Sequence, residues 1–511
     1  MKRLLYILVL LPLGINAQNM YNVSSLFGND LTGTARYVGM GGSMSALGAD
    51  MSTMGTNPAG MAMYRSNDVS ITAAVDVKTN RADYEGSLVE SGNTNAFIGN
   101  AAMVCAIEVD DEYLKYFNFG LGYRQKNNLA GSFEMYGASN GFSQQYVMEY
   151  MYRNNMFQYD NLKDWMYKDF AYSWLPLLAA DAGLYDDKGN FITYPDTALL
   201  WAPDELAYYE ETRGGVYTVD FNLAANICDR VYLGATLAVS TVDYTRYTEY
   251  IEAAAVDNPL YQPRNIYILE NNSYVKGSGC DLKLGVILRP FKYSPFKVGF
   301  AFHTPTWYSL REYSSADIID SYGERISTTD KVLYGDMLSI KSKLKTPWRL
   351  NASMAYTFGT YVALNAEYEY ADYTKGAFTS RGSVYSAQND EIKYNMKAQH
   401  TVRVGAELNI DGFAARLGYN YMTAPFVSGA YKELYNASVA ETSTEYMNRF
   451  DKNVITSGIG FHGKMLYFDL AYALEMQKAE FYPFYDFEIA NPGAAVTMAN
   501  HSVVATLGMR F

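Results

Sequence analysis

The sequence predicts an all-β fold: a 14-stranded antiparallel transmembrane β-barrel whose lumen holds an N-terminal hatch. Three observations predict this fold class. Apolar and polar residues alternate along runs of about ten residues, the length that a tilted strand needs to cross the hydrocarbon of a membrane. The candidate strands number fourteen, an even number as in bacterial single-chain barrels. Finally, short and long connections alternate between these strands.

The chain begins with a segment that has the layout of a secretory signal peptide. In residues 1–17, MKRLLYILVLLPLGINA, the cations Lys2 and Arg3 precede an apolar run over residues 4–13 and small residues that end at Ala17. The apolar run is too short for a spanning helix, which needs about 20 residues. We therefore expect cleavage before Gln18 and export of the mature chain.

The composition excludes several classes of protein. The formal net charge is −13, whereas a nucleic-acid partner would require clustered Lys and Arg. The chain has 48 tyrosines and 25 phenylalanines, yet no apolar stretch of 18 residues follows the leader. Two classes remain for an exported, aromatic-rich chain of this kind: a secreted all-β protein and an outer-membrane β-barrel.

Alternation with a period of two runs through most of the chain after residue 67. In residues 401–410, Val402 and Val404 face one side of the predicted strand, and Arg403 and Glu407 face the other. A soluble sandwich with one buried face would alternate in the same way. The fourteen candidate strands are residues 68–78, 96–108, 114–135, 215–227, 230–250, 268–289, 295–313, 335–358, 360–375, 395–410, 412–427, 443–462, 464–481 and 499–511.

The lengths of the connections favour the barrel over the sandwich. An up-and-down barrel has short turns on its periplasmic side and longer loops outside, whereas a sandwich has no reason to sort its loops in this way. The short connections are residues 109–113, 229–230, 289–295, 358–360, 411–412 and 462–464, and the long ones are residues 79–95, 136–214, 251–267, 314–334, 376–394, 428–442 and 482–498. We therefore assign residues 68–511 to the barrel, with a long, helix-like and aromatic extracellular insertion at residues 136–214.

Residues 18–67, which precede the first strand, are predicted to form the hatch. They are rich in Gly, Ala, Ser and Met, and they contain a compact turn, Asn57, Pro58, Ala59 and Gly60. Small residues permit close packing against a surrounding wall, and the Asn-Pro pair favours a turn. A disordered leader is the alternative interpretation of this segment.

Residues 36–64, with the pair Ala49-Asp50 and the Asn-Pro-Ala-Gly turn, resemble the amino-terminal hatch of the FadL family of outer-membrane transporters for long-chain fatty acids and other hydrophobic compounds. Residues 302–310 and 345–359 resemble later strands of that family, so the resemblance covers the whole mature chain. It implies a location in the cell outer membrane. The insertion at residues 136–214 is a departure from the family pattern.

The resemblance also implies a function. We expect a passive uptake channel that needs no cofactor, metal or catalytic residue. Its ligand would be a hydrophobic small molecule, captured at the outer loops, held in an apolar pocket, and released sideways after the hatch moves. The expected partners are this ligand, outer-membrane lipid and the outer-membrane assembly machinery, which commonly reads a terminal residue such as Phe511. We expect a monomer and no nucleic-acid partner.

Two groups of residues are candidates for the site. Gln125, Lys126, Asn127 and Asn128 follow one another in the third strand, where polar groups on both faces indicate a lateral gap in the wall or a strand that has left the membrane. Lumen charges are expected to form a wall network that holds the hatch, and one of them, such as Arg416, could instead contact a ligand carboxylate. The predicted lumen charges are Arg403, Glu407, Arg416 and Arg510, together with Asp469 and Glu475.

Three other functions remain as alternatives. A haem-uptake receptor would use exposed His or Tyr ligands, and the four histidines are scattered over four strands: His303, His400, His462 and His501. An outer-membrane hydrolase would need a Ser–His pair, but the adjacent Ser502 and His501 point to opposite faces of a strand. A polar porin would not need a hatch.

Overall fold

The computed structural model describes residues 19–28, 30–154, 174–182, 184, 203–254, 264–319, 324–329, 338–379, 385–432, 442–485 and 491–511. The expected signal peptide, residues 1–17, lies outside the described residues. No described helix is long and apolar enough to cross a membrane.

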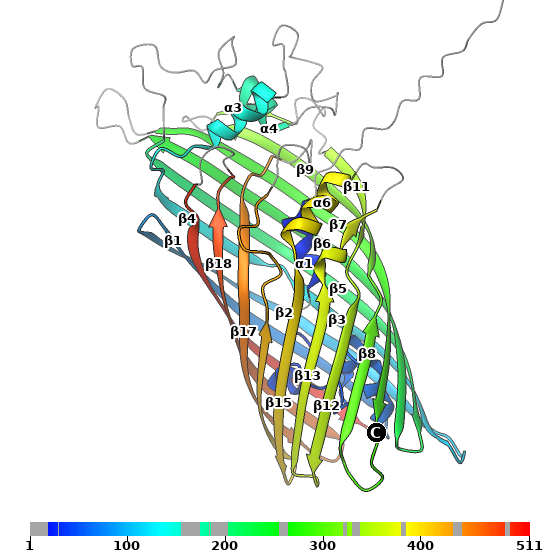
Figure 1. The fold of residues 1–511 in the computed structure, drawn as a ribbon. Coiled ribbons are helices and arrows are strands. Elements are labelled where there is room, and N and C mark those ends of the chain that lie inside the picture. The colour runs from blue at the N-terminus through cyan, green and yellow to red at the C-terminus, as the bar shows by residue number, and fades with distance from the viewer. Residues whose placement is uncertain are drawn as a thin grey trace, which may run out of the picture.

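Fourteen antiparallel strand positions form a closed barrel, as predicted (Figure 1). We call each position a stave, whether it is one strand or two consecutive strands of the chain. The ladder from Asp68–Arg510 to Asp83–Ala495 joins the first strand to the last and closes the ring. Ten staves are single strands: β1 (Asp68–Tyr84), β2 (Ser87–Glu108), β5 (Glu205–Ile227), β6 (Val231–Ala254), β7 (Arg264–Leu288), β15 (Ala398–Ile410), β16 (Phe413–Met422), β17 (Tyr446–His462), β18 (Leu466–Tyr482) and β19 (Ala494–Arg510).

The other four staves are each made of two strands. They are β3 (Leu114–Asn128) with β4 (Gly131–Ala138), β8 (Lys297–His303) with β9 (Trp307–Ile319), β11 (Leu338–Lys345) with β12 (Arg349–Phe358), and β13 (Val362–Asp372) with β14 (Ala377–Phe378). A short strand, β10 (Arg325–Thr328), pairs with the end of β9.

The two faces of the wall differ as the alternation predicts. On β15, Val402 and Val404 are exposed on the outer face, whereas Arg403 and Glu407 are buried toward the lumen. Along β1, the exposed Val69, Ile71 and Val75 alternate in the same way with buried residues. An apolar outer band and a polar interior are the pattern of a membrane β-barrel.

The prediction that short connections lie at one end of the barrel and long connections at the other is correct except at one long connection. Six short connections lie at one end: residues 109–113, 228–230, 289–296, 359–361, 411–412 and 463–465. The long connection expected at residues 79–95 is wrong, because β1 and β2 continue to a two-residue turn at Glu85 and Gly86. Both turn residues have positive φ, 50° and 83°, as a tight hairpin requires. These strand ends extend past the apolar band, so they need no apolar face and their sequence resembles a loop.

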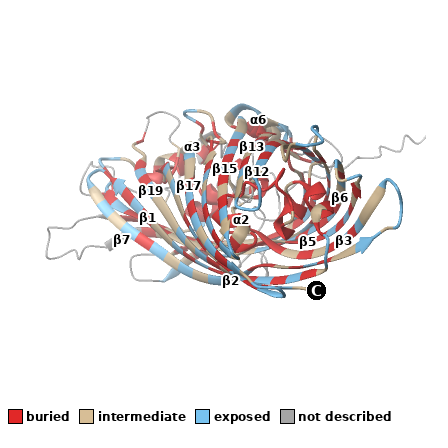
Figure 2. Cartoon of the chain, turned by 90° about the horizontal axis from the view of Figure 1, so that it is seen from below, coloured by how far each residue is buried: buried red, intermediate tan, exposed pale blue. Residues whose placement is uncertain are grey.

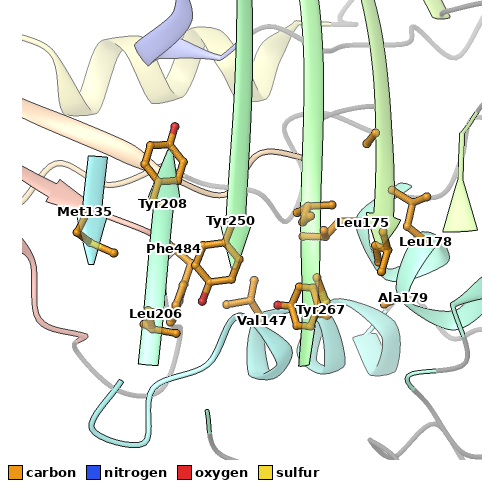
Figure 3. Close-up of a cluster of buried hydrophobic side chains, with 14 of the residues drawn as sticks. Met135, Val147, Leu175, Leu178, Ala179, Leu206, Tyr208, Tyr250, Tyr267 and Phe484 are labelled. Atoms are coloured by element: carbon orange, nitrogen blue, oxygen red, sulfur yellow. The ribbon is translucent and has the colours of Figure 1, made fainter. Parts of the chain in front are cut away.

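The insertion is shorter than predicted, and its described helices lie at the open end of the barrel. β4 ends at Ala138 and β5 begins at Glu205, so residues 136–138 and 205–214 belong to strands. Within the insertion, helices α3 (Gln144–Asn154) and α4 (Trp174–Asp181) lie at the mouth of the barrel (Figure 1). Their buried side chains pack against aromatic residues of the strand ends (Figure 3), and this cluster includes Val147, Leu175, Leu178, Tyr208, Tyr250, Tyr267 and Phe484.

Two prolines interrupt neighbouring staves at the same height. Pro305 lies between β8 and β9, and Pro347 lies between β11 and β12. Thr346 N donates to Thr306 O (3.1 Å), and Thr306 N donates to Thr346 Oγ1 (2.8 Å), so the two breaks are in contact. Both staves resume beyond the break. Proline without an N–H therefore interrupts these strands rather than ending them.

The N-terminal segment, residues 19–67, lies inside the ring of strands. It contains α1 (Met20–Phe27), α2 (Ala35–Gly39) and two 3₁₀ turns, η1 (Met51–Gly55) and η2 (Pro58–Met63). Seen from below, buried helical turns occupy the inside of the ring (Figure 2). α1 lies higher, beside α6 (Ser386–Asn395), where Met20 N donates to Glu391 Oε2 at 3.3 Å.

Candidate functional site

The Asn57–Gly60 turn is fixed by the side chain of its first residue. Asn57 is the N-cap of η2: its Oδ1 accepts from Ala59 N at 3.2 Å, while its Nδ2 donates to Ser45 O at 2.9 Å and to Val286 O at 3.4 Å. Pro58 follows at the first position of the turn, where its missing N–H costs nothing. One side chain therefore joins the turn to the N-terminal segment and to β7.

The barrel wall makes room for this turn with glycines. A Cβ at Gly234 would collide with the backbone of Pro58 and Ala59, and a Cβ at Gly285 would collide with the Asn57 side chain. At Gly299 it would meet Asn57 Nδ2 at 3.0 Å. The sequence signal, a glycine inside a strand where another backbone approaches closely, is present in β6, β7 and β8. The sequence analysis did not predict contacts of the turn from these strand glycines.

A buried ion-pair chain links α2 to the wall. Arg36 Nε and Nη2 each lie 2.8 Å from an oxygen of Glu407. Arg416 Nε also donates to Glu407 Oε2 (2.6 Å), and its Nη1 donates to Asp469 Oδ1 (2.6 Å). The Arg416 side chain is fully buried between these two carboxylates. This arrangement favours the wall network over the alternative that Arg416 contacts a ligand carboxylate.

The other predicted lumen charges separate into two groups. Arg403 pairs with Glu367 (2.7 Å) and Glu369 (3.2 Å), and Glu367 Oε2 accepts from Ser45 N of the N-terminal segment (3.3 Å). Arg510 pairs instead with Asp68 at 3.0 Å, next to the end of the chain. The geometry thus brings Arg403, Glu407 and Arg416 together around the segment and leaves Arg510 at the rim.

The β2–β3 ladder stops partway up the wall. It runs from Glu108–Tyr116 to Asn100–Arg124, whereas the β1–β2 ladder continues to Tyr84–Ser87. Beyond Arg124, the four residues 125–128 are all buried, and the β3–β5 register shifts between Gln125 and Asn127. A strand buried on both faces has turned inward from the wall.

The chain after this inward turn lies over the lumen face of β1. Lys78 Nζ donates to the carbonyl oxygens of Asn128 (2.8 Å) and Ala130 (2.7 Å), and Asn80 Nδ2 donates to Ser132 O (2.6 Å). Because β4 pairs in a ladder with β5, residues 87–99 of β2 have no ladder partner on their second side. Three hydrogen bonds bridge this edge of β2: Ser132 Oγ donates to Gly92 O, Glu134 N donates to Ser91 Oγ, and Asn95 Nδ2 donates to Asn128 Oδ1.

The start of the N-terminal segment closes the inner side of this break. Asp30 N donates to Lys126 O (3.2 Å), and Asn128 N donates to Asp30 Oδ2 (2.9 Å). Thr32 Oγ1 donates to Gln125 O (2.6 Å). We call these three hydrogen bonds the latch. Asp30 and Thr32 were not among the predicted site residues, and nothing local in their sequence identifies this long-range contact.

A cavity of about 370 Å³ adjoins the latch. Phe97 and Gly99 of β2, Asn127 and Asn128 of β3, and residues 30–33 are among its lining. The pocket expected from the resemblance was apolar, but this cavity is lined by charged groups beside its aromatic ones. The charged lining residues are Asp30, Asp76, Lys78, Glu210, Arg246, Arg449, Lys452 and Glu475.

The residues of the rival functions are not assembled into a site. Among the described residues, no group of three or more His, Cys, Asp or Glu could hold a metal ion. His303 contacts Thr56 O at 2.5 Å, and His462 contacts Asp469 at 3.1 Å. Ser502 Oγ donates to Asp76 Oδ1 inside the barrel (2.5 Å), whereas the neighbouring His501 contacts the hydroxyl of the exposed Tyr472 (2.7 Å).

Comparison with solved structures shows which proteins share this fold. A FadL homologue of Pseudomonas aeruginosa has a TM-score of 0.54 at 12% identity, over 95% of this chain and 99% of that one. The toluene transporter TodX of P. putida has a TM-score of 0.53 at 11% identity, over 94% and 99%. The monoaromatic hydrocarbon channel CymD has a TM-score of 0.50 at 12% identity, over 95% and 99%.

No protein-family model matches the sequence. No curated protein matches it either. The fold that the sequence resemblance implied is confirmed at these low identities.

Filling the wall beside the turn should displace the N-terminal segment. We expect Gly285→Ala to force its Cβ into Asn57, at a cost of about 1–3 kcal/mol for overpacking. In planar bilayers the variant should conduct ions more than the parent protein. Gly131→Ala is the matched control, because its Cβ would meet only Thr212 Oγ1, at 3.6 Å. Equal conductance of Gly285→Ala and the parent would show that the turn does not hold the segment in the bore.

Glu407 should contribute more than Arg36 to holding α2 against the wall. Glu407→Gln leaves Arg36 and Arg416 buried without their shared carboxylate, for which we expect a cost of about 3–5 kcal/mol. Arg36→Gln leaves Glu407 paired with Arg416 and should cost about 1–3 kcal/mol. Hydrogen exchange of residues 34–64 measures the opening free energy, and Arg510→Gln is the control. Equal exchange in all three variants would contradict the network.

Proposed function

We propose that this chain is an outer-membrane channel for the passive uptake of hydrophobic compounds, with long-chain fatty acids or similar amphiphiles as its ligands. In this proposal the N-terminal segment is a hatch that blocks the bore, and the ligand leaves sideways through the wall. The shared fold with a FadL homologue and with the transporter TodX supports this class of function.

One observation carries the proposal: the cavity adjoins the place where the β2–β3 ladder is open. An unpaired strand edge costs several kcal/mol per polar group in hydrocarbon, so a barrel normally has none. Asn100 lies eight residues from Glu108 at the short-turn end, about 20 Å up a tilted strand. The open edge therefore begins within the apolar band, which is about 25 Å tall. Phe97 and Gly99 of that edge also line the cavity.

In this proposal, movement of the hatch begins with breakage of the latch hydrogen bonds. A ligand in the cavity contacts residues 30–33, and displacing them breaks the bonds of Asp30 and Thr32 to the inward turn of β3. The inward turn then loses its bonds to residues 30–32 and keeps those to the wall, such as Lys78 Nζ to Asn128 O and Asn128 Nδ2 to Asp76. In this proposal, a further movement of the turn opens the path to the membrane between β2 and β3. Below this level the bore stays filled by α2, η1 and η2, which are held by the glycine contacts and ion pairs. No nucleotide or catalytic group takes part.

The cavity lining favours an amphiphile over a plain hydrocarbon. Arg449 offers a cationic group to a polar end of the ligand, whereas Lys452 is paired with Glu475 and Lys78 is bonded to two carbonyl oxygens. Leu31, Phe97 and other apolar residues contact the chain of the ligand.

A haem ligand is the alternative: no histidine lines the cavity, but Tyr21, Tyr244 and Tyr373 do, and tyrosine also ligates haem iron. The filled bore disfavours a polar porin.

Deletion of residues 125–128 tests the lateral path. Because of the bulge between Gln125 and Asn127, these four residues span three positions of the β3–β5 register, so the deletion also moves the side chains that follow to the other face. It also removes the inward turn and three acceptor or donor groups of the latch. We expect uptake of a fluorescent fatty acid into cells to be lost, with no loss of folded barrel as judged by its heat-modifiable mobility on gels.

A paired measurement identifies the ligand class. The parent protein, purified without long-chain detergents, is analysed by native mass spectrometry and by absorption in the haem Soret region. A retained fatty acid or similar amphiphile supports the proposal. Unchanged uptake by the deletion variant would exclude the lateral path, and bound haem would favour the haem receptor.

A further inference from the structure

Five cations gather on the outer face of three adjacent staves. The ladders place Lys276 of β7 directly opposite Arg311 of β9, and Arg311 directly opposite Lys341 of β11. Lys343 and Lys345 follow on the same face of β11, because the residues between them, Ser342 and Leu344, are buried. We call Lys276, Arg311, Lys341, Lys343 and Lys345 the cation patch.

The cations of the patch have no ion-pair partner in the described part of the chain. No carboxylate in the described part of the chain forms an ion pair within 4.0 Å of any of the five side chains. The neighbouring acid is Asp243 of β6, which the ladder places opposite Lys276. Like charges directly opposite one another destabilise a sheet. In a chain of net charge −13, such a cluster indicates an anionic partner outside the protein.

The cation patch lies at the outer edge of the apolar band. Lys276 is twelve residues from Leu288 at the short-turn end, which corresponds to about 30 Å at the usual rise and tilt of barrel strands. Below it the outer face is apolar, with Leu282 and Leu284 of β7 and Phe302 of β8 exposed. The band itself is about 25 Å tall in such barrels.

Aromatic rings surround the cations, as expected at a membrane boundary. Lys276 Nζ lies 4.9 Å from the ring centroid of Tyr313 and 5.4 Å from that of Tyr274. Trp307 is half exposed and lies opposite Lys345. Rings at this level contact both head groups and the upper parts of acyl chains.

Other strands carry tyrosine–histidine pairs on their outer face. Tyr368 is bonded to His400 on β13 and β15, and Tyr472 is bonded to His501 on β18 and β19, each at 2.7 Å. The two histidines lie about ten residues from the short-turn end, and the two tyrosines lie about six residues from it. Exposed cations also occur on other strands, at Arg81 of β1 and Lys478 of β18, whereas on β7, β9 and β11 the cations lie directly opposite one another.

We propose that the cation patch binds the phosphate groups of a lipid head group in the outer leaflet. Arg pairs with phosphate through two parallel N–H donors, and Lys supplies point charges beside it. Three strands about 4.8 Å apart give the row Lys276–Arg311–Lys341 a span of about 10 Å, enough for two phosphates of one head group. The apolar face below contacts the acyl chains, which favours a lipid over a free phosphate ion. This inference rests on the outer-membrane location proposed above.

Native mass spectrometry of the purified full chain tests the proposal, with lipid A that carries two phosphates as the probe. We expect the triple variant Lys276→Gln/Arg311→Gln/Lys341→Gln to weaken binding at least ten-fold. A second variant, Lys343→Gln/Lys345→Gln, should weaken it less. The matched control is Lys115→Gln/Lys292→Gln/Lys464→Gln, which removes the same charge near the short turns and should bind like the parent.

The outcomes separate the lipid from other sources and from the channel proposal. Equal binding of dephosphorylated lipid A, or equal binding by the triple variant and the parent, would overturn the site. Displacement of the lipid by an equal concentration of inorganic phosphate would overturn the lipid as its occupant. Loss of fatty-acid uptake is measured separately, so a failure of the channel proposal leaves lipid binding unaffected, and the reverse.

Discussion

Backbone hydrogen bonding in hydrocarbon is the constraint on which the rest of this structure depends. Each unpaired N–H or C=O group costs several kcal/mol in lipid, so strands can span a membrane only in a ring without edges. The β1–β19 ladder closes that ring. The same constraint makes the open edge of β2 informative, because residues 87–99 lack a ladder partner on one side and this edge begins within the height of the apolar band.

The lumen shows how a wall and its filling segment fit each other. The wall has glycine, which carries no side chain, where the Asn57 turn contacts it, at Gly234, Gly285 and Gly299. It supplies carboxylates where α2 brings a cation, so Arg36 is bound rather than buried alone. Above this level the contacts change in kind, and a few hydrogen bonds from Asp30 and Thr32 hold the inward turn of β3. In the proposed mechanism, the lower part of the segment, with its ion pairs and close glycine contacts, blocks the bore. The upper part, with the hydrogen bonds of Asp30 and Thr32, is the part that moves.

Much of the fold was predictable from the sequence because the relevant signals are local. Alternation assigned Arg403 and Glu407 to the lumen, and the fourteen strands follow from periodicity and turn residues. The strand ends of β1 and β2 were missed because they extend into water, where alternation is not required. The cavity could not be derived, since Asp76, Lys452 and Glu475 come from different staves. The latch joins residues about 95 positions apart, a contact that no local pattern records.

The direct test of the account is to find where a ligand leaves the barrel. A fatty acid that carries a photoactivatable group near its end is bound to the protein in lipid nanodiscs, cross-linked, and mapped by mass spectrometry. The account predicts cross-links to the open edge of β2, around Phe97 and Ile98, and to the inward turn at residues 125–128. Cross-links to Met51, Met61 and Asn226 beneath the turn, with none at the β2 edge, would mean that the ligand passes straight down the bore and would contradict the lateral path.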